Sequence, residues 1–232
     1  MFRFQEETGY ANFKGKERVD SVDTYWDTDY DLDDPNGWEG RHKYEAEMLS
    51  EVIKKLNITK VLELGSGPGN LATKIIDSTS VSYTMIDGES ALRAHTRRGN
   101  KGNLLVQDLF DSFDTIGLDK DYDLVIANDF LEHIRNPSLI LERVRDDLTA
   151  SKSWFFLSSP NWRMKHLFFY PGLFDFDNLI KFFNQEGYEL KHLFDSWSHH
   201  VPVRAPRLSS ESAVPEGHLY DWNYYLLFQK KS

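Results

Sequence analysis

The chain has 232 residues, of which 40% are hydrophobic and 28% charged, and its formal net charge is −10. This length and composition suit one large soluble domain, and no run of 18 apolar residues is present that could cross a membrane. Cysteine is absent, which excludes disulfides, thiolate metal sites and cysteine nucleophiles. The acidic balance disfavours long nucleic acids as partners, and the acidic first ten residues argue against a secretory signal, so we expect a cytoplasmic protein.

Helix and strand patterns alternate from residue 41 onward. The first is an amphipathic helix over 41–57, with Tyr44, Met48, Val52 and Leu56 on one stripe. Further helices are predicted over 70–77, 89–98, 136–148 and 176–187. Strands are predicted over 60–65, 81–87, 103–108, 122–128, 153–160, 188–194 and 224–230.

This alternation, with strands that are nearly continuous apolar runs, predicts an α/β fold with a mainly parallel sheet covered on both faces. The last two strands have no helix between them, so they are expected to pair antiparallel and give a doubly wound, seven-stranded, Rossmann-like sheet with one reversed edge strand. We expect residues 1–40 to cap the main domain at 41–232. About 25 residues separate the last two strands, which predicts a functional lid over 195–219.

Polar residues close the strands at the predicted carboxyl edge, where doubly wound sheets bind ligands. Strand 60–65 runs into three glycines (Gly65, Gly67 and Gly69), which permit close approach to the backbone and its N–H groups. Asp87 after the second strand suits a ribose diol, and Asp108 after the third suits an adenine amino group. The set describes a nucleoside-containing cofactor.

The glycine spacing indicates which cofactor. Glu63-x-Gly65-x-Gly67-x-Gly69 is neither the G-x-G-x-x-G of dinucleotide binding nor a P-loop with its lysine. It resembles motif I of class I S-adenosylmethionine-dependent methyltransferases, and the resemblance covers about residues 41–194. "ANDFLEHI" and "LSSPNWR" are similar to the branch that includes ubiquinone-biosynthesis O-methyltransferases and methionine-biosynthesis W-like proteins.

This resemblance implies S-adenosylmethionine as the cofactor. The methionine moiety would lie against Glu63 and the glycines, the ribose at Asp87, the adenine at Asp108 and Leu109, and the methionine amine at Asn128. The full cofactor-binding set that we predict is Glu63, Gly65, Ser66, Gly67, Gly69, Asp87, Gly88, Asp108, Leu109, Asn128 and Asp129.

Methyl transfer requires alignment of donor and acceptor and removal of a proton. We take His133 as a candidate base, with His199 and His200 as further candidates; the alternative is that "LEH" merely begins a helix. Spacing would place Asp129, Glu132 and His133 on one helical face, which resembles the E-x-x-E-H set of metal-dependent members that include small-RNA 2′-O-methyltransferases. We predict no metal and keep this set as the alternative.

The expected acceptor site combines aromatic and basic residues from three segments. The predicted substrate residues are Tyr25, Trp26, Trp162, Arg163, Trp197 and Arg204. They favour a small acceptor that has a ring or an anionic group and is methylated on oxygen or nitrogen. The alternatives are an RNA or protein methyltransferase and a non-catalytic accessory protein; no membrane partner is expected, and the oligomeric state stays open.

Overall fold

The structure is a computed structural model that describes residues 35–109, 112–160, 176–194, 196–198, 201–203 and 223–231. The calls on Tyr25, Trp26, Trp162, Arg163, His199, His200 and Arg204 lie outside these residues. In chain order the elements are α2 (Pro35–Leu56), β1 (Lys60–Leu64), α3 (Asn70–Ser78), β2 (Ser82–Asp87), α4 (Glu89–Arg98), β3 (Asn103–Val106), β4 (Tyr122–Asn128), η1 (Leu131–His133), α5 (Pro137–Arg143), η2 (Val144–Leu148), β5 (Thr149–Pro160), α6 (Phe176–Gln185), β6 (Tyr188–Phe194), β7 (Ser196–Ser198), β8 (Val201–Val203) and β9 (Asn223–Lys230).

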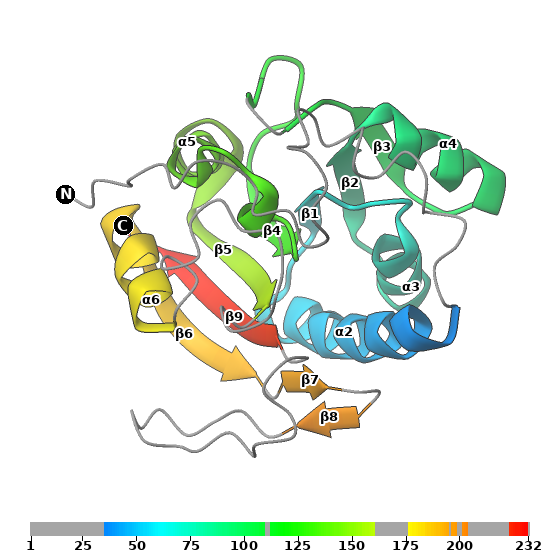
Figure 1. The fold of residues 1–232 in the computed structure, drawn as a ribbon. Coiled ribbons are helices and arrows are strands. Elements are labelled where there is room, and N and C mark those ends of the chain that lie inside the picture. The colour runs from blue at the N-terminus through cyan, green and yellow to red at the C-terminus, as the bar shows by residue number, and fades with distance from the viewer. Residues whose placement is uncertain are drawn as a thin grey trace, which may run out of the picture.

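Seven strands form one sheet in the order β3-β2-β1-β4-β5-β9-β6, and β9 alone runs antiparallel to its neighbours. The doubly wound α/β fold is therefore confirmed. The expected position of the reversed strand is wrong, because β9 lies between β5 and β6 and not at an edge (Figure 1). Residues 223–228 are all buried, and an internal position covers such a strand on both faces.

Helices cover both faces of the sheet (Figure 1). On one face α2, α3 and α4 pack through Leu49, Ile53, Ile75 and Ala91. On the other, α5 and α6 pack through side chains such as Ile140 and Phe183. The ring of Phe183 stacks on that of Phe228 from β9, with centroids 4.1 Å apart. Apolar side chains thus fill most of the space between the sheet and its helices.

Helix ends follow the sequence signals. Asn136 caps α5, its side chain accepting from the Leu139 N–H at 3.2 Å, and Pro137 begins the helix as predicted. The helix then widens into the π-helix η2, which keeps Val144 and Leu148 buried. The first helix begins at Pro35, six residues before the expected start.

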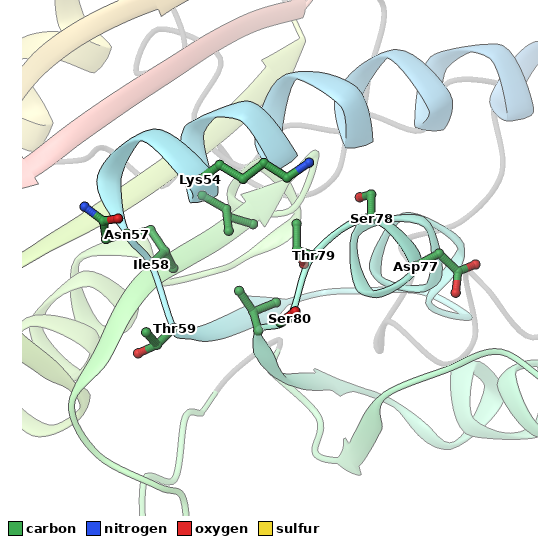
Figure 2. Close-up of a pocket in the computed structure, with 10 residues that line it drawn as sticks. Lys54, Asn57, Ile58, Thr59, Asp77, Ser78, Thr79 and Ser80 are labelled. Carbon is green, nitrogen blue, oxygen red and sulfur yellow. The ribbon is translucent and has the colours of Figure 1, made fainter.

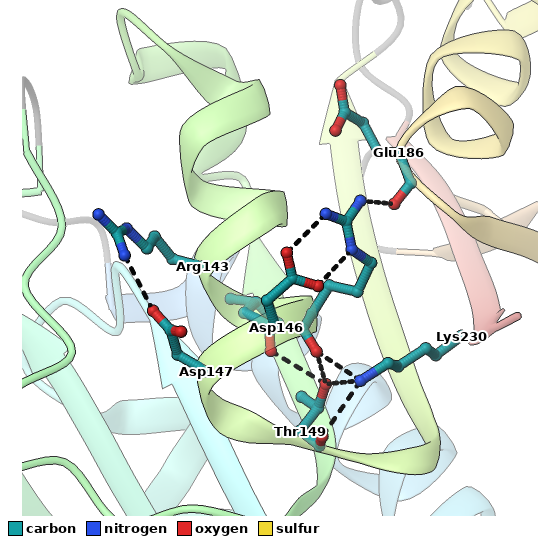
Figure 3. A network of polar contacts seen from close by, with 8 residues as sticks. Arg143, Asp146, Asp147, Thr149, Glu186 and Lys230 are labelled. Atoms are coloured by element: carbon teal, nitrogen blue, oxygen red, sulfur yellow. Dashed lines mark hydrogen bonds and ion pairs between the residues drawn. The ribbon is translucent and has the colours of Figure 1, made fainter. Parts of the chain in front are cut away.

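At the amino edge of the parallel strands, a polar network joins η2 to β5, β9 and the end of α6 (Figure 3). Lys230 donates to the carbonyls of Arg145 and Thr149, the second at 3.2 Å. Arg145 forms two hydrogen bonds of 2.7 Å with Asp146 and a third, of 2.8 Å, to the Glu186 carbonyl. These contacts satisfy carbonyls where the helices end.

The predicted lid at 195–219 is described only at β7 and β8, which form a two-stranded antiparallel hairpin. Trp197 lies in β7, opposite Pro202. No helix in the described part of the chain is long and apolar enough to cross a membrane.

Candidate functional site

The glycine loop, residues 65–69, begins at the carboxyl end of β1. The N–H of Gly65 donates to the Ile86 carbonyl of β2 at 2.9 Å, and the Gly69 N–H donates to the Ser66 carbonyl at 3.2 Å. Gly65, Gly67 and Gly69 all have positive φ, of 65°, 54° and 80°. Such a backbone is accessible to glycine at little cost, which explains why the sequence repeats it.

Two of these glycines are also required by packing. A Cβ on Gly65 would lie 2.2 Å from Cδ2 of Phe130, whose ring comes from the turn after β4. A Cβ on Gly69 would lie 2.9 Å from the sulfur of Met85 and 3.0 Å from Nδ1 of His95. The close approach that the pattern predicted is therefore made, at these two positions, by the protein itself.

Asp87 closes β2 beside this loop. Its Oδ2 accepts from the Gly67 N–H at 2.6 Å, and its Oδ1 accepts from the Gly88 N–H at 2.7 Å. Both of these hydrogen bonds come from backbone N–H groups, which hold the half-buried carboxylate in place. The middle glycine and the acid that we predicted for the ribose form one unit.

Asp129 follows β4 with a left-handed φ of 49°, which is uncommon outside glycine. Its N–H donates to the Ser158 carbonyl at 3.1 Å, and its Oδ1 accepts from Ser158 Oγ at 2.6 Å and Asn223 Nδ2 at 2.7 Å. Its Oδ2 lies 2.5 Å from Nη2 of Arg41. These contacts hold the strained turn that lays Phe130 over Gly65.

Glu45 of α2 is the second centre of this network and is fully buried. Its carboxylate accepts from Arg41 Nε at 2.6 Å, from Tyr225 Oη at 2.9 Å and from Asn128 Nδ2 at 3.1 Å. We did not predict the network residues Arg41, Glu45, Ser158, Asn223 and Tyr225. The one available signal was Arg41 and Glu45 at i, i+4 beside the apolar stripe of the first helix.

Glu63 is buried in β1 and points toward the α2 face of the sheet. Its Oε2 accepts from Tyr83 Oη at 2.9 Å. Burial raises the pKa of Glu63 to about 8, partly offset by the Tyr83 hydrogen bond, and the nearby charges of Glu45 and Asp87 raise it further. Because its pKa is raised, the Glu63 carboxyl binds a proton more readily, and the bound proton reduces the negative charge next to the glycine loop.

Glu132, in η1, is fully buried, and neither carboxyl oxygen has a hydrogen-bond partner among the described residues. Burial, and then the charge of Asp129, raises the pKa of Glu132 well above its ordinary value. His133, which is 6% exposed, has Nε2 at 3.9 Å from Glu132 Oε1. Asn128 Oδ1 is another buried acceptor without a partner among the described residues. Unsatisfied polar groups of this kind gather at functional sites.

The predicted cofactor residues fall into two groups. Glu63, the glycine loop, Asp87, Gly88, Asn128 and Asp129 converge on neighbouring strand ends, since β1 pairs with both β2 and β4. Asp108 is exposed just after β3, and Leu109 is 5% exposed and packs in the core with Phe113. The expected helical face for Asp129, Glu132 and His133 is wrong, because η1 is a three-residue 3-10 helix that begins after the left-handed turn. No group of three potential metal ligands is found among the described residues.

A pocket of about 620 Å³ opens at the amino edge, between the ends of α2 and α3 (Figure 2). It lies at the opposite edge from the glycine loop, beside Thr59 and Val81, which precede β1 and β2. The hydroxyls of Thr59 and Thr79 already bond to Asp123 and to the Ile75 carbonyl, both at 2.7 Å. This hollow is separate from the carboxyl-edge site.

Comparison with known proteins identifies the chain's family. A model described as a methyltransferase domain matches residues 33–206, more than half of the chain. The chain belongs to this methyltransferase family. It is therefore an S-adenosylmethionine-dependent methyltransferase of the class I superfamily. No curated protein matches the chain.

Solved methyltransferase structures share the fold. The plantazolicin methyltransferase BpumL, in complex with a pentazolic desmethylPZN analog and S-adenosylhomocysteine, is 17% identical with a TM-score of 0.61 and covers 92% of both chains. An S-adenosylmethionine-dependent methyltransferase from Clostridium acetobutylicum is 11% identical, covers 81% of this chain and 91% of its own, and has a TM-score of 0.58. Magnesium protoporphyrin IX methyltransferase from Synechocystis is 14% identical, covers 95% and 88%, and has a TM-score of 0.55.

Proposed function

We propose that this methyltransferase transfers the methyl group of S-adenosylmethionine to an oxygen or nitrogen of a small-molecule acceptor. The observation that carries the proposal is the unit formed by Asp87 and the glycine loop. Two backbone N–H groups aim the carboxylate at the carboxyl edge, where a ribose diol can donate to it. This is the edge at which doubly wound sheets bind nucleosides.

The charge of the surroundings supports the same cofactor. Glu45, Glu63, Asp129 and Glu132 lie at this end of the sheet, and Arg41 is the cation that contacts two of them. Burial raises the pKa of Glu63 and of Glu132, so the negative charge there rests on the carboxylates of Glu45, Asp87 and Asp129. These carboxylates favour a ligand that brings positive charge, as a sulfonium and an ammonium do. A pyrophosphate would meet repulsion instead. The buried Oδ1 of Asn128, which has no hydrogen-bond partner in the described part of the chain, is a further acceptor for an ammonium donor.

For the proton, we propose His133 as the group that accepts it while the acceptor gains the methyl group and the cofactor leaves as S-adenosylhomocysteine. His133 follows β4, and its Nε2 lies 3.9 Å from Oε1 of Glu132, whose carboxyl has no hydrogen-bond partner among the described residues. His199 and His200 are the alternative bases, and Trp197 with the other predicted substrate residues would surround the acceptor. A cytoplasmic location and the ubiquinone-biosynthesis-like or methionine-biosynthesis W-like branch stay predictions.

Calorimetric titration with S-adenosylmethionine, S-adenosylhomocysteine and NADH tests the cofactor part of this proposal. We expect micromolar binding of the two sulfur nucleosides and none of NADH. Asp87→Ala should weaken S-adenosylhomocysteine binding by about a hundredfold, because two charge-assisted hydrogen bonds to the ribose are lost. Asp119→Ala is the matched control, since Asp119 is 69% exposed and pairs with Lys60 at the opposite edge.

Wild-type affinity in the Asp87→Ala variant would contradict the ribose assignment. Failure of the wild-type protein to bind either sulfur nucleoside would contradict the catalytic proposal and favour the accessory-protein alternative. Once binding is established, small metabolites with rings and with anionic groups are the first acceptors to screen. Methylation of RNA or protein in place of small molecules would contradict the acceptor class alone.

A further inference from the structure

Two side chains at the end of α4 converge on one carbonyl of the glycine loop. His95 Nδ1 lies 3.0 Å from the Pro68 carbonyl oxygen, and Asn100 Nδ2 donates to the same oxygen at 2.6 Å. A carbonyl can only accept, so Nδ1 of His95 carries the proton. We call His95 and Asn100 the α4 clasp.

The geometry of the clasp depends on how α4 ends. Gly99 adopts a left-handed φ of 65°, and the N–H groups of Gly99 and Asn100 donate back to the carbonyls of Thr96 and His95. This turn reverses the chain and brings the Asn100 side chain against the loop. His95 itself is 8% exposed, so its hydrogen bond is made away from water.

The clasp also contacts the two residues that follow Pro68. Asn100 donates to Asn70 Oδ1 at 3.0 Å, at the first residue of α3. The His95 ring packs so close to Gly69 that a Cβ there would lie 3.0 Å from Nδ1. On the other side, Gly67 donates to Asp87. The loop is therefore held from the sheet through Asp87 and from α4 through Pro68.

Pro68 explains why a second support is needed. It has no N–H, so it cannot anchor the loop to the sheet as a donor, and each flanking glycine is conformationally free. The peptide between Pro68 and Gly69 is held on its N–H side by the 3.2 Å bond from Gly69 to the Ser66 carbonyl, and the bonds to the Pro68 carbonyl hold its other side against rotation. That rotation would change the direction of the neighbouring N–H groups, which cradle the ligand in a loop of this kind.

We infer that His95 and Asn100 are positioning residues that set the affinity for the cofactor by fixing the Pro68 carbonyl and hence the glycine loop. Neither residue needs to contact the cofactor. The inference rests on the proposed function in that the loop is taken to bind S-adenosylmethionine. It assigns a role to a helix that the sequence patterns connected with no function.

The test uses His95→Phe, which keeps a ring of similar volume but has no donor, and Asn100→Ala. Binding of S-adenosylhomocysteine is measured by calorimetry well below each variant's unfolding midpoint, and backbone amide exchange is followed over residues 64–72. We expect each variant to weaken binding about three- to tenfold and to speed exchange in the loop. Thr96→Ala is the matched control, because Thr96 is exposed on the same helix.

The double variant distinguishes a shared role from two separate ones. Because both side chains bond to one oxygen, the loss in the double variant should differ from the product of the two single losses. Unchanged affinity in both single variants, with only a lower unfolding midpoint, would overturn the inference and leave a structural role. If the wild-type protein binds no S-adenosylhomocysteine, the proposed function fails first, and the inference fails with it.

Discussion

Both edges of the sheet carry polar side chains, but their hydrogen bonding and burial differ between the two edges. At the amino edge, Asp123 accepts three hydrogen bonds from Thr59 and Lys60, and Lys230 closes the carbonyls at the end of η2. At the carboxyl edge, Asp129 holds a left-handed turn, Glu63 has a raised pKa and Glu132 has no hydrogen-bond partner among the described residues.

The difference shows which edge of the sheet holds the groups that lower the stability of the fold. Charged groups at the amino edge are exposed or hydrogen-bonded, and the buried groups there that have no hydrogen-bond partner among the described residues, such as the hydroxyls of Ser153 and Tyr188, are neutral. At the carboxyl edge, carboxyls are buried close to one another, which lowers stability unless a ligand compensates. Left-handed non-glycine residues occur at both edges, Asn57 and Asp121 at the amino edge and Asp129 at the carboxyl edge. Among the described residues, however, the buried carboxyl oxygens without a hydrogen-bond partner are those of Glu132 at the carboxyl edge, which is the pattern expected when that edge binds something.

The largest test of this difference between the edges is to substitute two glycines that have the same φ, one at each edge. Gly65→Ala should lower the free energy of unfolding by about 2–5 kcal/mol, because the left-handed backbone and the overlap with Phe130 both cost energy. Gly99→Ala has an equal φ of 65° but no atom within 4 Å, so about 1 kcal/mol is expected. Urea denaturation measures both. Equal losses would mean that Phe130 gives way, and that the carboxyl edge is less tightly packed than described.

A second comparison removes one arginine from each edge. Arg41→Met leaves the buried carboxylate of Glu45 and that of Asp129 without their cation, and should cost about 3–5 kcal/mol. Arg143→Met breaks a pair with Asp147 whose side chains are 50% and 34% exposed, and should cost less than about 1 kcal/mol. Denaturant midpoints give the two values. Similar losses would show that burial at the carboxyl edge adds nothing to the importance of its ion pair.

The sequence predicted the bounds of helices and strands better than it predicted the contacts between them. Strand and helix bounds come from local apolar periodicity, so α4, β4 and β6 match the predicted ranges. The network of Glu45 could not be predicted, because Tyr225 is 180 residues away in the chain and nothing local indicates the pairing. The position of β9 inside the sheet was missed for the same reason, since antiparallel pairing to β6 is compatible with an edge or an interior strand.

The glycine loop also shows that sequence patterns do not reveal contacts between residues far apart in the chain. Its spacing correctly indicates a backbone that something approaches closely. It cannot tell that Phe130, brought in by the turn at Asp129, approaches Gly65, or that His95 approaches Gly69. Those neighbours depend on where β4 and α4 lie in three dimensions. The site residues are therefore predicted by strand ends, and their supports are found only in the fold.

The last prediction distinguishes the two edges by the sign of the pH dependence of their stability. The pKa of Glu63 is raised from 4.5 to about 8, so the folded state binds more protons than the unfolded state between these values. The contribution of Glu63 to the free energy of unfolding must then fall as pH rises through that window, by at most about 1.4 kcal/mol per pH unit. Glu63→Gln should remove this slope.

Asp146 at the amino edge supplies the opposite sign. The hydrogen bonds from Arg145 lower the pKa of Asp146 below its ordinary value of 3.8, so its contribution is present above that pH and is lost as pH falls through the folded-state pKa. Asp146→Asn should therefore leave stability between pH 5 and pH 8 with an unchanged slope. Urea titrations at several pH values compare the variants. If Glu63→Gln keeps the wild-type slope, the carboxyl of Glu63 is ionised in the folded protein, and the charge at the carboxyl edge is more negative than its burial implies.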